Sequence, residues 1–241
     1  MGEIKFDMHV HCHVSKDSIA SPDSICKRLK KIGFSGLALT DHNSYTGIPD
    51  MKRSCKKYNI NLIEGVEIYT SYGELMVFFA TEPINMRNLD YEAICEDVRS
   101  KDGLIVIPHP YDIKRSSRFI IEYVHPTTFK KFTDGVEVFN ARIINPKKPI
   151  ERAKKLKEKY DLFEIGGSDA HQPRELGHSY TVIPEDYAFT LESNDELKKV
   201  FEQKKVIAKG TVSNPLVHLV SFVHKWSKIV NHKVTGRPAE Q

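Results

Sequence analysis

Short apolar segments alternate with amphipathic segments along most of the chain, and this alternation predicts strands and helices in turn. Strands are expected near residues 3–11, 36–40, 61–69, 75–80, 103–108, 135–139, 163–167 and 179–184. Helices are expected near residues 21–33, 48–58, 90–101, 149–160 and 193–204, with a short strand near 206–212 after them. Such alternation is typical of a parallel sheet wrapped by helices, and the number of repeats favours a closed or nearly closed barrel.

The first predicted strand carries histidines on one of its faces. Successive side chains of a strand point to opposite sides of the sheet. This alternation places Ile4, Phe6, Met8 and Val10 on an apolar face, and Asp7, His9 and His11 on a polar face. The apolar face is expected to pack against helices. The two imidazoles look inward from the C-terminal end of the strand, where they can hold one metal ion together.

Four more groups of metal-ligand residues follow the ends of predicted strands. They are Thr40-Asp41-His42, Gly65-Val66-Glu67, Pro108-His109-Pro110 and Gly167-Ser168-Asp169-Ala170-His171. Each group taken singly is better explained by a surface or hydrogen-bonded core role. In a barrel, however, the C-terminal ends of the strands meet at one mouth, where active sites are built. Imidazoles and carboxylates that converge there can hold several metal ions, so the sequence predicts a metal-dependent hydrolase.

The order and spacing of these motifs resemble the PHP (polymerase and histidinol phosphatase) superfamily, specifically its small stand-alone phosphoesterases, over roughly residues 4–184. The resemblance implies a distorted (β/α)7 TIM-like barrel, which is expected to span residues 1–190. The pattern of strands and helices changes after it, and a basic α/β extension over 191–241 is expected to pack on the barrel. The resemblance also implies two or three divalent ions at the C-terminal mouth. The implied ligands are His9, His11, Glu67 and Asp169 for one ion, Glu67 and His109 for a second, and Asp17, His42 and His171 for a third.

One position departs from the metal-rich members of that family. Where they carry a further histidine after a later strand, this chain has Asn140. An amide oxygen is a poor ligand for zinc, so the occupancy of the second site is left open.

The resemblance implies hydrolysis of a phosphate ester by a hydroxide that bridges two metal ions, with Asp169 as a ligand and catalytic proton acceptor. Zinc, manganese and iron all suit these ligands, so the sequence does not select one. Arg142 and Arg118 are the predicted substrate-binding residues because a guanidinium matches two phosphate oxygens, although a solvated surface role is an equal alternative. The substrate is left open among phosphorylated small molecules, nucleotides and oligonucleotide 5′ ends.

Composition and charge indicate where the protein is expected to reside and which partners it is expected to have. No apolar run is long enough to span a bilayer and no leader is seen, so a soluble cytoplasmic protein without a membrane partner is expected. The net charge of +4 is concentrated in residues 198–241, which hold nine Lys or Arg against two Glu. This surplus could attract nucleic acid, although a solvated face is the more frequent explanation. A final helix is expected from Asn214 and Pro215 onward.

Two other functions remain open from the sequence. A metal-dependent amidohydrolase or deaminase also places His-x-His after its first barrel strand, and a non-catalytic PHP module could bind nucleic acid through the basic extension. Thr40-Asp41-His42 together with Asp169-x-His171 favours the phosphoesterase, because that family adds a third ion. The nearly complete ligand set favours catalysis over binding alone.

Overall fold

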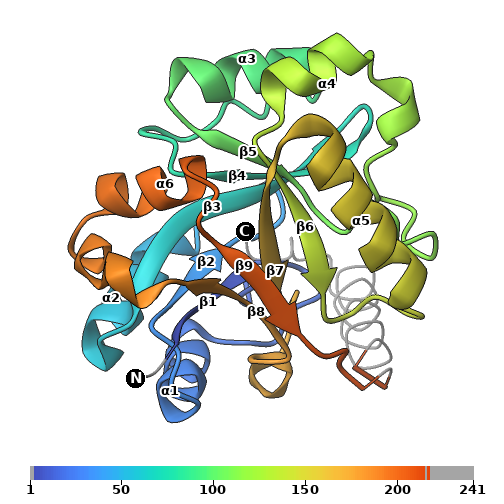
Figure 1. The fold of residues 1–241 in the computed structure, drawn as a ribbon. Coiled ribbons are helices and arrows are strands. Elements are labelled where there is room, and N and C mark those ends of the chain that lie inside the picture. The colour runs from blue at the N-terminus through green and yellow to red at the C-terminus, as the bar shows by residue number, and fades with distance from the viewer. Residues whose placement is uncertain (1–2, 215, 218–241) are drawn as a thin grey trace, which may run out of the picture.

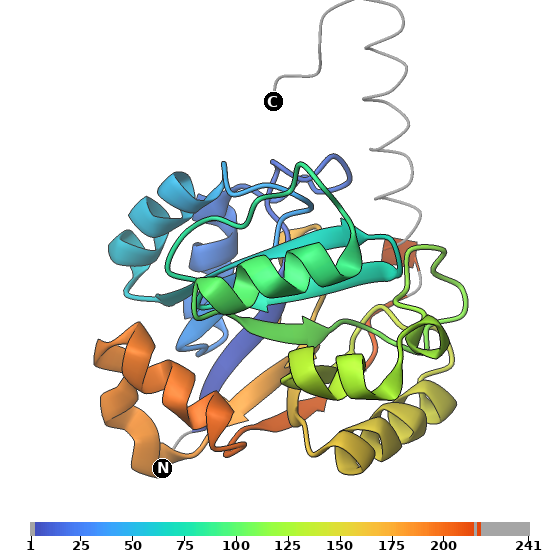
Figure 2. The same ribbon diagram turned by 90° about the horizontal axis from the view of Figure 1, so that it is seen from above.

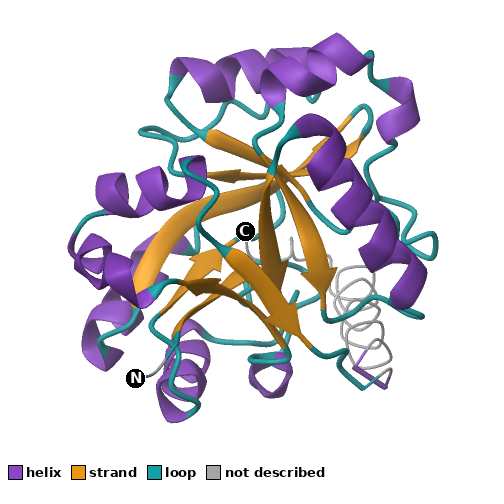
Figure 3. Ribbon diagram, viewed as in Figure 1, coloured by secondary structure: helices purple, strands orange, loops and turns teal. Residues whose placement is uncertain are grey.

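Nine strands form one curled sheet in the computed structural model, which describes residues 3–214 and 216–217. Figures 1 and 3 show the strands gathered as a nearly closed barrel in the middle of the molecule, with most helices outside it. The strand order is β7-β6-β5-β4-β3-β2-β1-β8-β9. The strands are β1 (Ile4–Val10), β2 (Gly36–Leu39), β3 (Asn61–Thr70), β4 (Gly73–Phe78), β5 (Leu104–Ile107), β6 (Gly135–Asn140), β7 (Phe163–Gly167), β8 (Ser179–Ile183) and β9 (Ile207–Gly210). The α-helices are α1 (Pro22–Lys31), α2 (Ile48–Tyr58), α3 (Tyr91–Ser100), α4 (Pro126–Phe132), α5 (Lys147–Tyr160) and α6 (Asn194–Glu202).

The predicted barrel is confirmed, but its sheet is mixed rather than parallel throughout. Strands β1, β2 and β3 pair in parallel, as do β5, β6 and β7. Strand β4 pairs antiparallel with β3 and β5, and β8 pairs antiparallel with β1 and β9. The prediction of a parallel sheet is wrong at β4 because only Ser71 and Tyr72 separate β3 from β4. Two residues can make a hairpin but leave no room for a crossover helix.

Strand β7 approaches β1 and β8 across the seam that nearly closes the barrel. The Thr181 hydroxyl in β8 accepts a hydrogen bond from the Gly166 amide (2.9 Å) and donates one to the Gly166 carbonyl (3.1 Å). Asp7 in β1 accepts a hydrogen bond from the Ser168 amide at 2.8 Å. A Cβ atom at Gly167 would lie 2.3 Å from the Cβ atom of His9, so glycine is required for this approach. The seam therefore places the end of β7 against β1.

Side chains of β1 do not alternate as the sequence predicts. The three apolar residues from Ile4 to Met8 belong to the cluster that fills the barrel, whereas Val10 packs with residues of α1 and α2. The pairing of β1 with β2 shifts register between Asp7 and Val10. An irregularity of this kind changes which face a side chain occupies. The residues from Ile4 to Met8 therefore pack in the interior of the barrel, in a cluster that α6 joins, and Asp7 turns to the seam.

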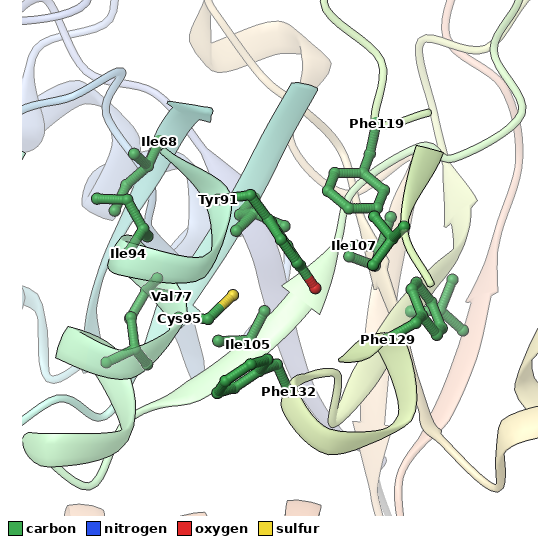
Figure 4. Packing of buried hydrophobic residues seen from close by; sticks show 14 of the residues in the cluster. Ile68, Val77, Tyr91, Ile94, Cys95, Ile105, Ile107, Phe119, Phe129 and Phe132 are labelled. Carbon is green, nitrogen blue, oxygen red and sulfur yellow. The ribbon is translucent and has the colours of Figure 1, made fainter. Parts of the chain in front are cut away.

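Apolar clusters hold the helices on the barrel. One cluster joins α3, α4 and α5 to β3, β4, β5 and β6. Figure 4 shows part of it, with Tyr91 and Cys95 of α3 beside Ile105 of β5 and Phe132 of α4. A second cluster joins α1 and α2 to β1 and β2. Helix α6 contributes to the cluster that fills the barrel. Figure 2 shows α6 near the start of β1, at the end of the barrel opposite the loops that follow β1 and β2.

The C-terminal extension begins inside the packing of the barrel. Strand β9 pairs with β8 and so joins the sheet, and the Ser213 amide donates a hydrogen bond to the Ala141 carbonyl at 2.7 Å. The final helix predicted from Asn214 onward lies almost entirely outside the described residues, as does part of the basic charge. None of the helices in the described part of the chain has the length and hydropathy to cross a membrane.

Candidate metal centre

Side chains of the types that bind metals gather at the mouth of the barrel, and we call them the ligand cluster. All the predicted ligands lie in it, and Glu74 of β4 joins them. The ligand cluster consists of His9, His11, Asp17, His42, Glu67, Glu74, His109, Asp169 and His171. Within the described residues, nitrogen or oxygen atoms lie within 4.8 Å of one another in four groups: His9, His11 and Glu67; His9, His109 and Asp169; His11, His42 and His171; and His42, Glu67 and Glu74.

Glu67 lies at the centre of the ligand cluster. Its Oε2 atom is 3.1 Å from Nδ1 of His42. The same oxygen is 3.4 Å from Nε2 of both His9 and His11. Its Oε1 atom is 3.2 Å from Nε2 of His109. One buried carboxylate thus faces four imidazoles, and its two oxygens can bridge two cations.

Asp17 joins two histidines at the more exposed side of the ligand cluster. Its Oδ1 atom lies 3.4 Å from Nε2 of His171, and its Oδ2 atom lies 3.7 Å from Nε2 of His42. The ring of His11 lies close to both histidines, with centroid distances of 4.4 Å to His42 and 4.5 Å to His171. These groups form a site beside the one around Glu67.

Hydrogen-bonding groups behind the ligands control how the imidazoles are turned. Oε1 of Glu137 in β6 lies 3.1 Å from Nδ1 of His9, and Oε2 accepts a hydrogen bond from the His109 amide at 2.8 Å. The Ser15 hydroxyl lies 3.3 Å from Nδ1 of His11. A proton on Nδ1 of His9 that is shared with Glu137 leaves Nε2 free to bind a cation.

Two of the predicted ligands follow their strands in a backbone conformation that L-residues rarely adopt. The φ angle is 29° at His109, just beyond β5, and 54° at Asp169, just beyond β7. Residues held at positive φ cost free energy and concentrate where the surrounding structure maintains a functional geometry. Both turns aim a ligand side chain into the ligand cluster.

Burial and mutual contact shift the pKa values of the ligands. Burial opposes the charge of Glu67, but His9 and His42 hold its pKa well below the usual range. Burial also opposes the charge of His42, yet the Glu67 carboxylate raises the His42 pKa to about 10. Burial, together with the charges of His42 and His171, lowers the pKa of His11 to about 3. His11 is therefore neutral at pH 7, as an imidazole ligand must be.

The donor set fits divalent cations. Oε2 of Glu67, Oδ1 of Asp169 and Oδ1 of Asp17 are buried, and none of the three has a hydrogen-bond partner among the described residues. Buried acceptors without a donor are costly, and a cation satisfies them. Mixed imidazole and carboxylate ligands suit zinc, manganese and iron alike, so these residues fit metal ions without selecting one.

The two predicted arginines differ in how they lie relative to the ligand cluster. Nη1 of Arg142 lies 2.8 Å from Nδ1 of His171, and its Nη2 lies 3.5 Å from the Val217 carbonyl. Within residues 3–214 and 216–217, the Arg118 side chain makes no hydrogen bond or ion pair to the ligand cluster. Arg115, earlier in the same loop, donates a hydrogen bond to Oδ2 of Asp169 at 2.5 Å. The loop after β5 thus reaches the ligand cluster through Arg115.

Asn140 does not turn its oxygen toward the ligand cluster. Its Oδ1 atom accepts a hydrogen bond from the Arg142 amide at 2.9 Å. Its Nδ2 atom donates to Oε2 of Glu137 (3.0 Å) and lies 3.3 Å from Oδ2 of Asp169. Asn140 therefore contacts two carboxylates through its amide nitrogen, while its oxygen is directed at the Arg142 amide.

The sequence motifs do not point to Glu74 or Glu137, and the sequence places Arg115 with Arg118 in a loop on the predicted active face without preferring it. A signal for the two acids exists, because each is a lone carboxylate inside an otherwise apolar strand whose alternate residues face the helices. Burial and the charge of Glu67 raise the pKa of Glu74 above its usual value. No comparable local signal separates Arg115 from Arg118, because both lie in one irregular loop.

Known proteins share the sequence motifs and the fold. The PHP domain family matches residues 7–207. An uncharacterized protein from Methanocaldococcus jannaschii is 36% identical over 196 residues, which cover 80% of this chain and 75% of that protein. A 5′-3′ exoribonuclease from Haemophilus influenzae is 38% identical over 68 residues, or 28% of this chain and 24% of the enzyme. A crystal structure from Bacteroides vulgatus, a two-domain protein containing a predicted PHP-like metal-dependent phosphoesterase, aligns with a TM-score of 0.70 at 17% identity over 92% of this chain and 70% of that chain.

Proposed function

Because the chain belongs to the PHP domain family, as its motifs predict, we propose that the ligand cluster is the active site of a metal-dependent phosphoesterase. The observation that carries the proposal is the convergence, within the described residues, of five imidazoles and four carboxylates at one barrel mouth. The protein from Bacteroides vulgatus, which contains a predicted PHP-like metal-dependent phosphoesterase, shares this fold, and that similarity supports the proposal.

The ligand cluster divides into sites for two or three cations. We assign His9, His11, Glu67 and Asp169 to one cation, Glu67 and His109 to a second, and Asp17, His42 and His171 to a third. When bound, divalent cations supply a water activated for attack at neutral pH and neutralise the oxygens of a phosphoryl group in an in-line displacement.

Asp169 is better suited to the role of ligand than to that of proton acceptor. Burial opposes its charge, but Arg115 and His9 hold the pKa of Asp169 well below its usual range. A carboxylate with so low a pKa is a weak base at pH 7. Oδ2 of Asp169 contacts Arg115 and Asn140, which leaves Oδ1 directed at the imidazoles of His9 and His11.

The function is tested by measuring phosphate release from a panel of esters with Mn²⁺ or Zn²⁺ and with a chelator. The panel holds a nucleoside monophosphate, a nucleoside bisphosphate, a small phosphate monoester and a 5′-phosphorylated oligonucleotide. We expect turnover of at least one ester with metal and none with the chelator. Matched amide and amino-purine substrates test the alternative hydrolase chemistry. Turnover of those substrates, with none of the esters, would contradict the proposal.

A 5′-phosphorylated oligonucleotide belongs in the panel for two reasons. The similarity to the exoribonuclease covers 28% of this chain, and residues 198–241 carry nine basic residues against two acidic ones. Phosphate-rich substrates are attracted by such charge in a salt-dependent manner. A nucleic-acid partner remains a prediction, and a rate that falls steeply with added salt for the oligonucleotide alone would support it.

Arg115 is the arginine that we assign first to the substrate phosphate, ahead of Arg142, with no such role for Arg118. Replacing Arg115 by glutamine is expected to raise KM for a phosphate monoester about 10- to 100-fold, because a hydrogen bond to a charged group contributes about 1.5–3 kcal/mol. Asn140 also contacts Oδ2 of Asp169, so the ligand stays in place and kcat changes less than KM. Arg118→Gln is the matched control in the same loop, and an equal rise in its KM would refute the assignment.

A further inference from the structure

Glu74 brings to the ligand cluster a carboxylate that neither the motifs nor the comparisons assign to a metal. We propose that Glu74 is a ligand of the cation held by Glu67 and His109, and that it supplies the ligand that Asn140 does not. The inference rests on the proposed function, because it concerns one of the same cations.

The spacing of the three side chains fits a shared cation. Oε2 of Glu74 lies 3.6 Å from Nε2 of His109, and Oε1 of Glu67 lies 3.2 Å from the same nitrogen. Ligand atoms bound at 2.0–2.2 Å to one cation lie roughly 3 to 3.5 Å apart. Glu74 is 1% exposed, and one of its oxygens also lies within 4.8 Å of ligand atoms of Glu67 and His42.

The surroundings of Glu74 favour a ligand over a simple hydrogen-bonding role. Glu74 and Glu67 are both buried in the ligand cluster, and Oε2 of Glu67 has no hydrogen-bond partner in the described structure. Two buried carboxylates close together repel each other unless a positive charge lies between them. Imidazoles that bind a metal ion must be neutral, so His42 and His109 cannot neutralise both acids in a loaded site, whereas a divalent cation can.

The loop after β5 holds Glu74 in position. The Ser117 hydroxyl donates a hydrogen bond to Oε2 of Glu74 at 2.7 Å, and the Glu74 amide donates to the Ser117 carbonyl at 2.9 Å. An oxygen that accepts one hydrogen bond keeps a second lone pair for a metal ion. Ser117 thus orients Glu74 by a hydrogen bond, as Glu137 orients His9.

The inference is tested by counting Mn²⁺ ions bound per chain by equilibrium dialysis for the wild type and Glu74→Gln. We expect Glu74→Gln to bind one ion fewer at concentrations that saturate the wild type, with Kd for that ion raised more than about 100-fold. A group that only orients a ligand changes metal affinity by about 10- to 100-fold. Glu64→Gln, at a partly exposed acid of β3 paired with Lys52, is the matched control and is expected to bind as the wild type does.

Two more variants separate the possible results. Ser117→Ala removes the orienting hydrogen bond and is expected to keep every ion, with Kd raised at most about 100-fold. Glu74→Ala is expected to lose the same ion as Glu74→Gln, and thermal unfolding in chelator shows that each variant folds. Full ion binding by Glu74→Gln with Kd raised no more than about 100-fold would overturn the inference and leave the proposed function intact. A wild type that binds no Mn²⁺ or Zn²⁺ would overturn both.

Discussion

Replacing Asp169 by alanine is expected to lower kcat/KM for metal-stimulated phosphate release by at least about 1,000-fold. Removing a group that only orients a metal ligand typically lowers activity by about 10- to 100-fold, so the larger loss is expected of a ligand itself. Oδ1 of Asp169 lies 3.5 Å from Nε2 of His11 and 3.8 Å from Nε2 of His9. The variant therefore loses a charged ligand where two imidazoles converge. Initial rates of phosphate release across a Mn²⁺ titration measure the effect.

The control for Asp169→Ala is Asp50→Ala, which removes a partly exposed carboxylate of α2 that pairs with Arg53. Its activity is expected to equal that of the wild type. His9→Ala is expected to lose activity as Asp169→Ala does, because both residues are assigned to one cation. Activity within tenfold of the wild type in either variant would remove the basis for that assignment.

Replacing Gly167 by alanine is expected to destabilise the protein by about 3 kcal/mol, the upper end of the range for overpacked sites. The added Cβ atom would lie 2.3 Å from the Cβ atom of His9 and 2.8 Å from its backbone nitrogen. Backbone atoms cannot move aside as a flexible side chain can, so β7 must shift away from β1. Urea unfolding in chelator measures the loss of free energy, and Mn²⁺ affinity is expected to fall as well because His9 moves.

Gly33→Ala is the matched control for Gly167→Ala. Gly33 ends the turn after α1 with φ of 75°, and an added Cβ atom would meet no other atom within 4 Å. Gly33→Ala is therefore expected to lower the free energy of unfolding by only about 1 kcal/mol, the cost of holding alanine in the left-handed backbone conformation. Equal destabilisation by the two substitutions would show that the contact between β7 and β1 is not tight.

Much of the fold can be predicted from local patterns, and its departures from prediction have physical causes. Buried strands such as Leu104–Ile107 are short apolar runs, and the helix Pro22–Lys31 begins at a Ser21 cap and ends before Gly33. Hydropathy alone does not show that β4 reverses direction, although the five residues between the predicted strands 61–69 and 75–80 are too few for a crossover helix. The side of the sheet on which Met8 lies could not be predicted either, because hydropathy does not reveal the register shift in β1.

The candidate site is predictable where chemistry and strand ends coincide. His9, His42 and Asp169 each lie at or just beyond the end of a strand, so the architecture alone brings them together. Glu74 lies near the start of antiparallel β4, a position that reaches the mouth because β4 runs in the opposite direction to β3. A search limited to the ends of strands misses it. Arg115 depends on how an irregular loop folds, which local sequence does not determine.

The meeting of β1 and β7 at the seam has a consequence for biosynthesis. His9 is made about 160 residues before Asp169, and Asp169 reaches it only after β7 has been added to the sheet. A nascent chain folds from its N-terminus as it emerges, and distant segments must wait for one another. A cation is therefore expected to bind between these two residues only late in synthesis. Metal binding at this place would then indicate that the barrel is complete.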